Sequence, residues 1–183
     1  MKNFTRILAV VLAAGALQAF AQNYPVRPVR AIIAFPPGSA TDIIGRVIVT
    51  KVSELWGQQV VPDNRGGAGG SIASALAAKA APDGYTLIIN SGAHAVNPSM
   101  YAKLSYDTLK DFVDIMPLVG QPNVLVVNPG SKLKTLADFL AEARANPGKI
   151  NFAFAGLGSG THLNSEKFKL DAKIDFTLVS YKG

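Results

Sequence analysis

The sequence predicts an α/β protein made of two successive units, each with a parallel sheet covered by helices. Short apolar, β-rich runs alternate with segments in which apolar residues recur at helical spacing. The predicted strands are continuously apolar, which is typical of parallel strands buried on both faces. This alternation stops near residues 92–118 and then starts again. We therefore expect two α/β units joined by that stretch.

The first unit is predicted from its apolar runs and from the Pro and Gly residues that end them. Pro36-Pro37-Gly38 ends a buried strand, Gly57 ends a long helix, and a glycine-rich loop over 63–70 opens an Ala-rich helix. The expected elements are a strand over Val29–Phe35, a helix over Ala40–Trp56, a strand over Gln59–Val61, a helix over Ser71–Ala81 and a strand over Tyr85–Asn90.

The second unit follows a break that Pro98 and Pro117 punctuate. Its expected elements are a strand over Val124–Asn128, a helix over Thr135–Ala145, a strand over Ile150–Phe154, a helix from Thr161 to about Leu170 and a strand over Phe176–Ser180. Thr161 is the candidate N-cap of its helix. Because the sequence stops at a strand-to-helix corner, we expect it to be truncated, a fragment of a longer chain.

The first 21 residues have the pattern of a secretory signal peptide. Lys2 and Arg6 form a positive start, Ile7–Leu17 is an uncharged run of eleven residues, and Ala19-Phe20-Ala21 is a small-x-small cleavage pattern. The run is shorter than the roughly 20 residues of a membrane-spanning helix. We expect cleavage after Ala21, with an uncleaved anchor as the alternative. Export of a chain without cysteine suits a bacterial periplasm.

Composition excludes several classes of protein. The 183 residues contain no Cys and two His, and the formal net charge is +6. Disulfide scaffolds and thiolate metal sites are excluded, and little material remains for a zinc site, so no metal or cofactor is expected. The basic residues are scattered, so no nucleic-acid partner is expected. The glycine loops match neither a Walker A motif nor G-x-G-x-x-G, and no catalytic motif is present.

Three strand-to-helix corners are candidate ligand sites, because open α/β sheets bind ligands at the carboxyl ends of their strands. Backbone amides at a helix start, together with the helix dipole, bind anions without a charged side chain. The first corner comprises Pro37, Gly38, Ser39, Ala40, Thr41 and Asp42; the second comprises Gly158, Ser159, Gly160, Thr161 and His162; the third contains Ser91. Asp42 is more simply a helix cap, His94 is more simply structural, and both interpretations of His162 stay open.

Several motifs resemble one known family. They are Tyr24-Pro25-x-Arg27-Pro28-Val29-Arg30, Phe35-Pro36-Pro37-Gly38, Thr41-Asp42, Asn64-Arg65-x-Gly67-Ala68-Gly69-Gly70, Ala81-Pro82-Asp83-Gly84-Tyr85-Thr86-Leu87, His94-x-x-Asn97-Pro98, Asn123-Val124-Leu125-Val126-Val127-Asn128-Pro129, Asn151-Phe152-Ala153, Gly160-Thr161-His162-Leu163 and Tyr181-Lys182-Gly183. In this order they resemble the solute receptors of tripartite tricarboxylate transporters, also called the Bug family or TctC-like periplasmic binding proteins. The resemblance covers the mature chain but only a little over the first half of a family member.

The resemblance implies a type II periplasmic-binding-protein fold with a ligand cleft between two domains. Domain 1 would comprise residues 22–95, completed by segments beyond this sequence, and residues 96–183 would form the hinge and an incomplete domain 2. The cleft would close on a small carboxylate such as a dicarboxylate, citrate, an amino acid or an aromatic acid. Backbone amides of the first and second corners would hold it, with Ser91 and Tyr181–Gly183 as weaker candidates.

Two residues depart from the family pattern. Ser39 replaces the usual second glycine of Pro-Pro-Gly-Gly and adds a side chain beside the expected carboxylate. Gly66 replaces a usual proline in a loop that we do not expect to touch ligand.

The predicted function is therefore binding without chemistry. A monomeric receptor would deliver its ligand to the membrane subunits of a transporter. Three rival hypotheses are a ligand sensor for a signalling system, a periplasmic hydrolase that uses Ser39 or Ser159, and a truncated receptor without function.

Overall fold

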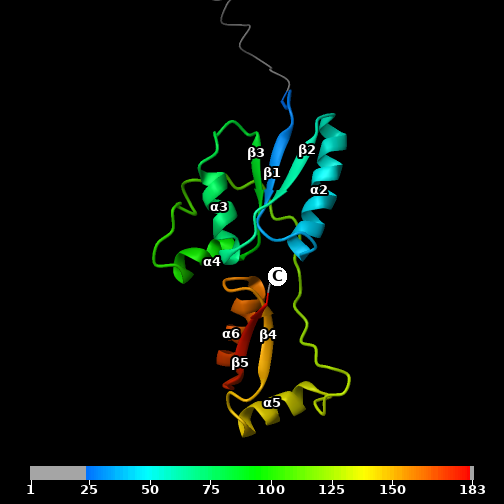
Figure 1. The fold of residues 1–183 in the computed structure, drawn as a ribbon, viewed down its shortest axis with the longest axis vertical. Coiled ribbons are helices and arrows are strands. Elements are labelled where there is room, and N and C mark those ends of the chain that lie inside the picture. The colour runs from blue at the N-terminus through cyan, green and yellow to red at the C-terminus, as the bar shows by residue number, and fades with distance from the viewer. Residues whose placement is uncertain (1–23, 182–183) are drawn as a thin grey trace, which may run out of the picture.

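The computed structural model describes residues 24–181 (Figure 1). The predicted signal peptide, its cleavage after Ala21, and residues 182–183 lie outside the described residues. The described chain forms two units, each built on its own parallel sheet. The α/β class and the parallel sheets predicted from the sequence are confirmed.

The first sheet has three strands in the order β2-β1-β3, and all its pairs are parallel. Its strands are β1 (Val29–Ile33), β2 (Val60–Asn64) and β3 (Thr86–Ile89). Its helices are α2 (Ala40–Trp56), the short 3-10 turn η2 (Ala68–Gly70), α3 (Ser71–Ala78) and α4 (Ala93–Met100). Every strand predicted for this unit is present, with bounds shifted by a few residues.

Helices cover both faces of the first sheet, as the apolar strands predicted. Val29 and Ala31 of β1 pack with Val49 on the α2 face. Ile32, which follows Ala31 and points to the opposite face, packs with Ala73 on the α3 face. Strand residues alternate between faces, so this one strand, apolar except for Arg30, supplies both cores. Figure 1 shows α2 and α3 on opposite sides of this sheet.

Local capping explains why α2 begins and ends where predicted. Ser39 is its N-cap and accepts a hydrogen bond from the backbone N–H of Asp42. Gly57 is its C-cap, with φ of 63° in the left-handed region, where glycine is favoured. Both signals lie in the sequence next to the helix, so they depend little on the rest of the fold.

The second unit pairs β4 (Asn151–Ala155) with β5 (Thr177–Tyr181) in a parallel sheet. Its helices are α5 (Leu136–Ala145) and α6 (Gly160–Ala172). Phe152 of β4 and Phe176 lie 4.5 Å apart between ring centroids, in a cluster with Phe139 of α5 and Phe168 of α6. Phe176 is 1% exposed, and burying a side chain of this size stabilises a fold by about 2–3 kcal/mol.

The second sheet differs from the first in its coverage within residues 24–181. Phe152 and Leu178 face the aromatic cluster, whereas Asn151, Ala153 and Thr177 are exposed. Only one face of this sheet is packed against described helices.

Four local predictions were wrong. Residues 124–128 are exposed and form no strand, because a strand needs a hydrogen-bonded neighbour and none of the described strands pairs with them. The α4 helix forms across Pro98, where the sequence predicted a break. The N-cap of α6 is Ser159 rather than Thr161. The Ala-rich helix predicted over Ser71–Ala81 ends at Ala78.

The chain stays against the first unit beyond residue 96. Helix α4 runs continuously across the predicted boundary between residues 95 and 96 and packs on η2 and α3. Tyr106 and Phe112 then pack against the His94 ring. The domain limits 22–95 and 96–183 stay predictions.

Candidate ligand-binding site

The β1–α2 loop and the β4–α6 loop share one backbone arrangement. Each contains a glycine in the left-handed region, Gly38 with φ of 84° and Gly158 with φ of 76°. The next residue is in both cases an extended N-cap serine, Ser39 with ψ of 159° and Ser159 with ψ of 165°. Both serine N–H groups donate to the carbonyl three residues earlier at 3.2 Å. Two sequence segments without an evident repeat therefore build the same turn.

This arrangement leaves two backbone N–H groups without an acceptor at each helix start. The serine hydroxyl oxygens accept from the third residue of the helix, Asp42 at 3.3 Å and His162 at 3.2 Å. The N–H groups of Ala40, Thr41, Gly160 and Thr161 donate to no acceptor among residues 24–181. Because unpaired amides at a helix N-terminus attract anions, each loop is a candidate carboxylate site.

Both candidate loops lie at the boundary between the two units. In Figure 1 the loop before α2 is at the end of the first unit that faces the second unit, and the loop before α6 is at the facing end of the second unit. Parallel strands direct their carboxyl ends to one edge of each sheet, which explains this placement. The tertiary structure therefore places the first and second corners predicted from the sequence at the facing ends of the two units (Figure 1).

Asp42 is directed into its own loop and α2. Its carboxylate accepts hydrogen bonds from the Gly38 N–H at 2.8 Å, from Arg46 Nε at 2.9 Å and from Asn64 Nδ2 at 2.8 Å. The hydrogen bond from Arg46 is the largest reason why the pKa of Asp42 is lowered to about 2, and the Gly38 bond adds to it. The geometry supports a structural role for Asp42, but the N-cap of α2 is Ser39, and Asp42 is the third residue of the helix. Its charge is compensated within the loop.

The side chains of the second loop also bond within the loop. Thr161 Oγ1 accepts from the Ala155 N–H at 3.0 Å and lies 2.9 Å from Ser159 Oγ. His162 Nδ1 accepts from the Gly158 N–H at 3.3 Å, and its ring stacks on Phe154 with centroids 4.7 Å apart. His162 therefore holds the turn that precedes it, and the structural interpretation is the one that its contacts support.

The remaining predicted residues lie at the strand ends. Pro37 is exposed in the first loop, and Ser91 follows β3, where its Oγ accepts from the Ala93 N–H at 3.3 Å. Tyr181 is the last residue of β5 and its side chain is 63% exposed. Gly66, which the sequence placed away from ligand, packs close to the first loop: a Cβ on it would lie 2.8 Å from Pro36 Cδ.

His94 anchors a polar network under the first unit's glycine turn. Its Nδ1 lies 3.0 Å from Ser74 Oγ, which in turn donates to the Gly70 carbonyl and accepts from Asn90 Nδ2. Burial lowers the pKa of His94, and the charge of Asp114 opposes this shift. The predicted structural role of His94 agrees with these contacts.

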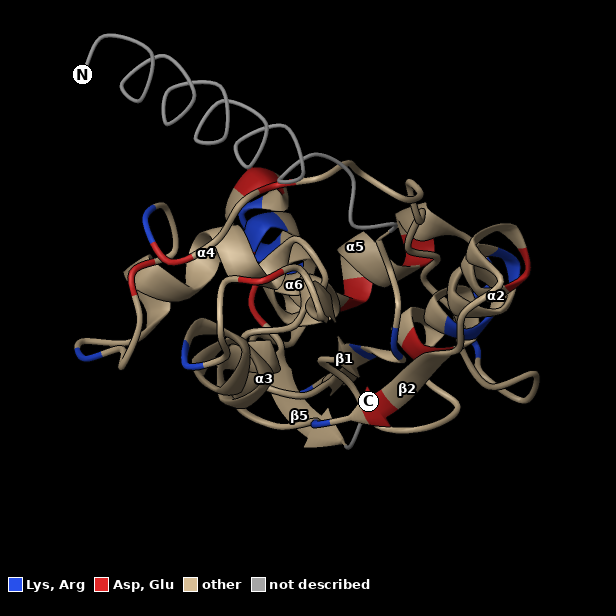
Figure 2. Cartoon of the chain, turned by 90° about the horizontal axis from the view of Figure 1, so that it is seen from above, with Lys and Arg blue, Asp and Glu red and all other residues tan. Residues whose placement is uncertain are grey.

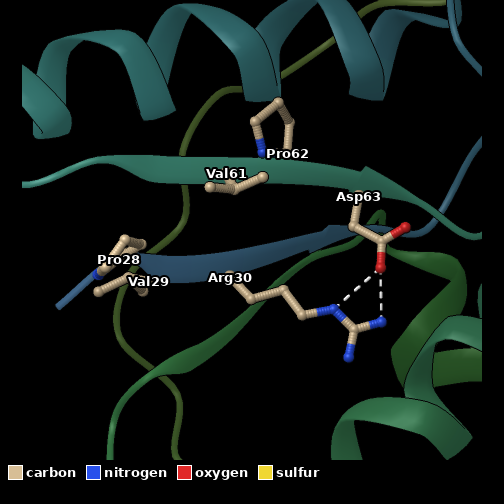
Figure 3. A pocket seen from close by; sticks show the side chains of 6 residues that line it. All are labelled: Pro28, Val29, Arg30, Val61, Pro62 and Asp63. Atoms are coloured by element: carbon tan, nitrogen blue, oxygen red, sulfur yellow. Dashed lines mark hydrogen bonds and ion pairs between the residues drawn. The ribbon is translucent and has the colours of Figure 1, made fainter.

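Surface pockets lie away from the predicted residues. One of about 400 Å³ is lined by Pro28, Val29, Arg30, Val61, Pro62 and Asp63, with an ion pair between Arg30 and Asp63 across two strands (Figure 3). Another of about 370 Å³ runs along α3 and the residues after α4. Neither contains a residue of the two loops. The candidate site therefore rests on backbone amides at the boundary between the units.

Charge and metal chemistry add no second candidate site. Basic and acidic residues are intermixed on the described elements, as the pairs Lys51–Glu54 and Lys167–Asp171 illustrate (Figure 2). Within residues 24–181, no group of three or more His, Asp and Glu side chains lies close enough to hold a metal ion. No helix in this range is long and apolar enough to cross a membrane.

Comparison with known proteins identifies the family. The family model described as "Tripartite tricarboxylate transporter family receptor" matches residues 44–183. The chain belongs to this family. It is 40% identical to Protein BugT of Bordetella pertussis over 188 residues, covering 99% of this chain and 58% of BugT. The resemblance seen in the sequence motifs is confirmed.

Solved structures of the receptor family have the same fold. An R. palustris protein solved with adipate superposes with a TM-score of 0.82 at 37% identity, over 87% of this chain and 54% of that chain. MatC from Rhodopseudomonas palustris, solved with bound malate, gives a TM-score of 0.77 at 32% identity, with 87% and 55% covered. The chain spans about half the length of the relatives it matches. The matched family is one of solute-binding receptors, which bears out the prediction that the protein is not an enzyme.

The structure also shows two residues that the sequence analysis did not select. Gly69 and Asn97 occur in family-like motifs, but neither was predicted to be part of the site. Gly69 contacts the second loop directly, and Asn97 is fully buried beneath Gly69. The one available signal was the glycine-rich run over 66–70.

Proposed function

We propose that the protein is the periplasmic receptor of a tripartite tricarboxylate-type transporter and binds a small carboxylate without chemistry. The observation that carries this proposal is the pair of equivalent helix starts, with unpaired amides at Ala40 and Thr41 in one unit and at Gly160 and Thr161 in the other. Carboxylates in two solved neighbours, adipate and malate, support the choice of ligand class.

The proposed mechanism follows from the split site. A carboxylate that accepts from both pairs of amides makes all its hydrogen bonds only when the two units are close together. Ligand therefore favours the closed arrangement, because a ligand shifts a conformational equilibrium by its difference in affinity for the two states. The closed arrangement would then be the form that membrane subunits of the transporter recognise. The receptor acts as a monomer in this scheme.

The first experiment screens carboxylates against the purified full-length protein. Adipate, malate, citrate, amino acids and aromatic acids are tested by thermal shift, and each ligand that raises the melting temperature is titrated by calorimetry. At least one carboxylate is expected to raise the melting temperature, because it binds only the folded state. Absence of any shift across the whole panel would contradict the proposal.

Proline substitutions then test the amides themselves. Proline is tolerated at the first position of a helix, where it removes one N–H and keeps the backbone. Ala40 and Gly160 hold that position in α2 and α6, and each follows an extended serine whose ψ suits a following proline. Leu136 holds it in α5, behind an extended Thr135 with ψ of 164°, and provides the matched control.

The expected result is a selective loss of affinity. Ala40→Pro and Gly160→Pro each remove one hydrogen bond to an anion, which weakens binding roughly tenfold to hundredfold. Leu136→Pro leaves affinity unchanged, and all three variants keep melting temperatures near that of the wild type. Equal affinity in all three variants would show that these amides do not hold the ligand.

Export is tested separately by the mass and N-terminal sequence of the protein in a periplasmic extract. A mature chain that begins at Gln22 is expected. A chain that retains residues 1–21 would favour the uncleaved anchor.

A further inference from the structure

The two units touch through a glycine-to-glycine contact. A Cβ atom built on Gly69, in η2 of the first unit, would lie 3.1 Å from the Cα and carbonyl carbon of Gly158 and 3.1 Å from the Leu157 carbonyl oxygen. A Cβ on Gly158 would lie 3.4 Å from Gly69 Cα. Main chain therefore meets main chain here: a Cβ on Gly69 would be crowded by a few tenths of an ångström, and a Cβ on Gly158 would be in van der Waals contact. Carbon atoms normally pack at about 3.5–4.0 Å.

Asn97 supports the Gly69 side of this contact. Its side chain is fully buried, and its Nδ2 donates to the Gly69 carbonyl at 3.4 Å and to the Tyr106 hydroxyl at 3.2 Å. Its Oδ1 accepts no hydrogen bond among residues 24–181 and lies 3.8 Å from the Cβ position of Gly158. The Tyr101 hydroxyl is 3.4 Å from the same position. Asn97 therefore links α4 of the first unit to the turn that the second unit touches.

The contact bears directly on the second candidate loop. Gly158 precedes the N-cap Ser159, so a displacement of Gly158 moves the amides of Gly160 and Thr161 with it. A contact between backbones in packed surroundings cannot be relieved by a side-chain rotation. The position of Gly69 therefore limits how closely the amides of the second loop approach those of the first.

We propose that the Gly69–Gly158 contact sets the closest approach of the two units, with Asn97 as the positioning residue that holds Gly69 in place. The contact determines the spacing between the two anion-binding helix starts and thereby the size of carboxylate that both can hold. Its effect on ligand rests on the proposed function, whereas the spacing itself can be measured without ligand.

A matched pair of asparagine substitutions tests the contact. Asn tolerates left-handed backbone better than other side chains, which limits strain at both positions. Gly69→Asn places its side chain against Gly158. Gly57→Asn is the control, because Gly57 has φ of 63° against 60° for Gly69 but has no atom within 4 Å of its Cβ position.

The readout is the distance between the units. The sequence contains no cysteine, so Thr50→Cys on α2 and Asn164→Cys on α6, both exposed, give two unique sites for spin labels. The distance distribution is measured by double electron–electron resonance in the full-length protein, first without ligand and then with malate.

The wild type and Gly57→Asn are expected to share the same shortest distance between the spin labels. In Gly69→Asn this distance is roughly 2–3 Å longer, because the carboxamide extends that much further than the glycine hydrogen. Malate affinity falls at least fivefold in Gly69→Asn and is unchanged in Gly57→Asn. An identical shortest distance in the two variants would overturn the proposal. If malate and every other carboxylate fail to bind the wild type, the proposed function fails. The distances between the spin labels measured without ligand then test this inference by themselves.

Asn97→Leu provides a second variant that fills similar space without a donor. The Gly69 turn then lacks its side-chain hydrogen bond, so a broader distance distribution is expected. A distance distribution with the mean and width of the wild type would overturn the positioning role of Asn97. If Gly69→Asn does not fold, this measurement on Asn97→Leu tests the proposal in its place.

Discussion

The backbone N–H of Gly38 donates a 2.8 Å hydrogen bond to the carboxylate of Asp42, four residues later in the chain. This bond closes the first candidate loop on itself and leaves the two amides between Ser39 and Asp42 unpaired among residues 24–181. Arg46 compensates the charge of Asp42 from the next turn of α2. A loop that needs no ligand to hold its shape is arranged in advance for binding.

Removal of Asp42 should destabilise the protein much more than removal of an exposed carboxylate. Asp42→Ala loses hydrogen bonds to Gly38, Arg46 and Asn64, and a cost of about 2–3 kcal/mol is expected because the acceptor is charged and buried. Asp171→Ala breaks only the exposed pair with Lys167 and should cost less than about 1 kcal/mol. Denaturant unfolding measures both, and equal losses would contradict the structural role of Asp42.

Acid should remove the contribution of Asp42 over a defined range. Its pKa is about 2 in the folded protein against an ordinary value of 3.8. A depressed pKa stabilises the fold above the ordinary value, and this stability is lost as pH falls from about 4 to about 2. The difference in unfolding free energy between wild type and Asp42→Asn should therefore be constant above pH 5 and shrink below pH 4. A difference that is still constant at about pH 2 would show that Asp42 is not involved.

His94 should make stability fall with decreasing pH in a second, less acidic range than that of Asp42. Burial lowers its pKa below 6.5, with Asp114 in partial opposition, so the fold favours the neutral ring. Stability is present above pH 6.5 and is lost as pH falls through the folded-state pKa. His94→Phe is expected to flatten the decline in unfolding free energy as the pH falls below 6.5, whereas His162→Gln, which retains His94, should keep this decline. The two variants are compared by denaturant unfolding at each pH.

The start of α5 offers a local test of helix capping. Thr135 accepts from the Asp138 N–H at 3.1 Å, and the Asp138 carboxylate accepts from the Thr135 N–H at 2.9 Å, which is a reciprocal capping box. Thr135→Ala should cost about 1 kcal/mol of unfolding free energy. Thr50→Ala, on the exposed side of α2, is the control and should change stability little. A cost at Thr135 no larger than at Thr50 would mean that the box does not stabilise α5.

Signals confined to a few neighbouring residues were sufficient to predict much of this protein. Helix α2 was predicted with its observed bounds from the helical spacing of its apolar residues and from Gly57, which caps its end. The parallel class followed from continuous apolar strands, and the two candidate loops followed from glycine and serine at strand-to-helix corners. The family motifs then identified the receptor class.

Tertiary structure decided the features that depend on a distant partner. The apolar run over 124–128 has strand composition but forms no strand, because strand formation requires hydrogen bonds to a neighbour that no described segment provides. Helix α4 forms across Pro98 because Asn97 is fully buried against the Gly69 turn, and packing outweighs an unfavourable local residue.

The contact between Gly69 and Gly158 likewise has one part that the sequence explains and one part that only the tertiary structure decides. Each glycine is explained locally by its left-handed backbone, with φ of 60° and 76°. Their contact could not be inferred from either segment, because the contact depends on how the two sheets are placed against each other. Sequence alone thus determined the turns, caps and loops that hold the candidate site. The fold determined their spacing, because through-space packing between distant segments leaves no local pattern in the chain.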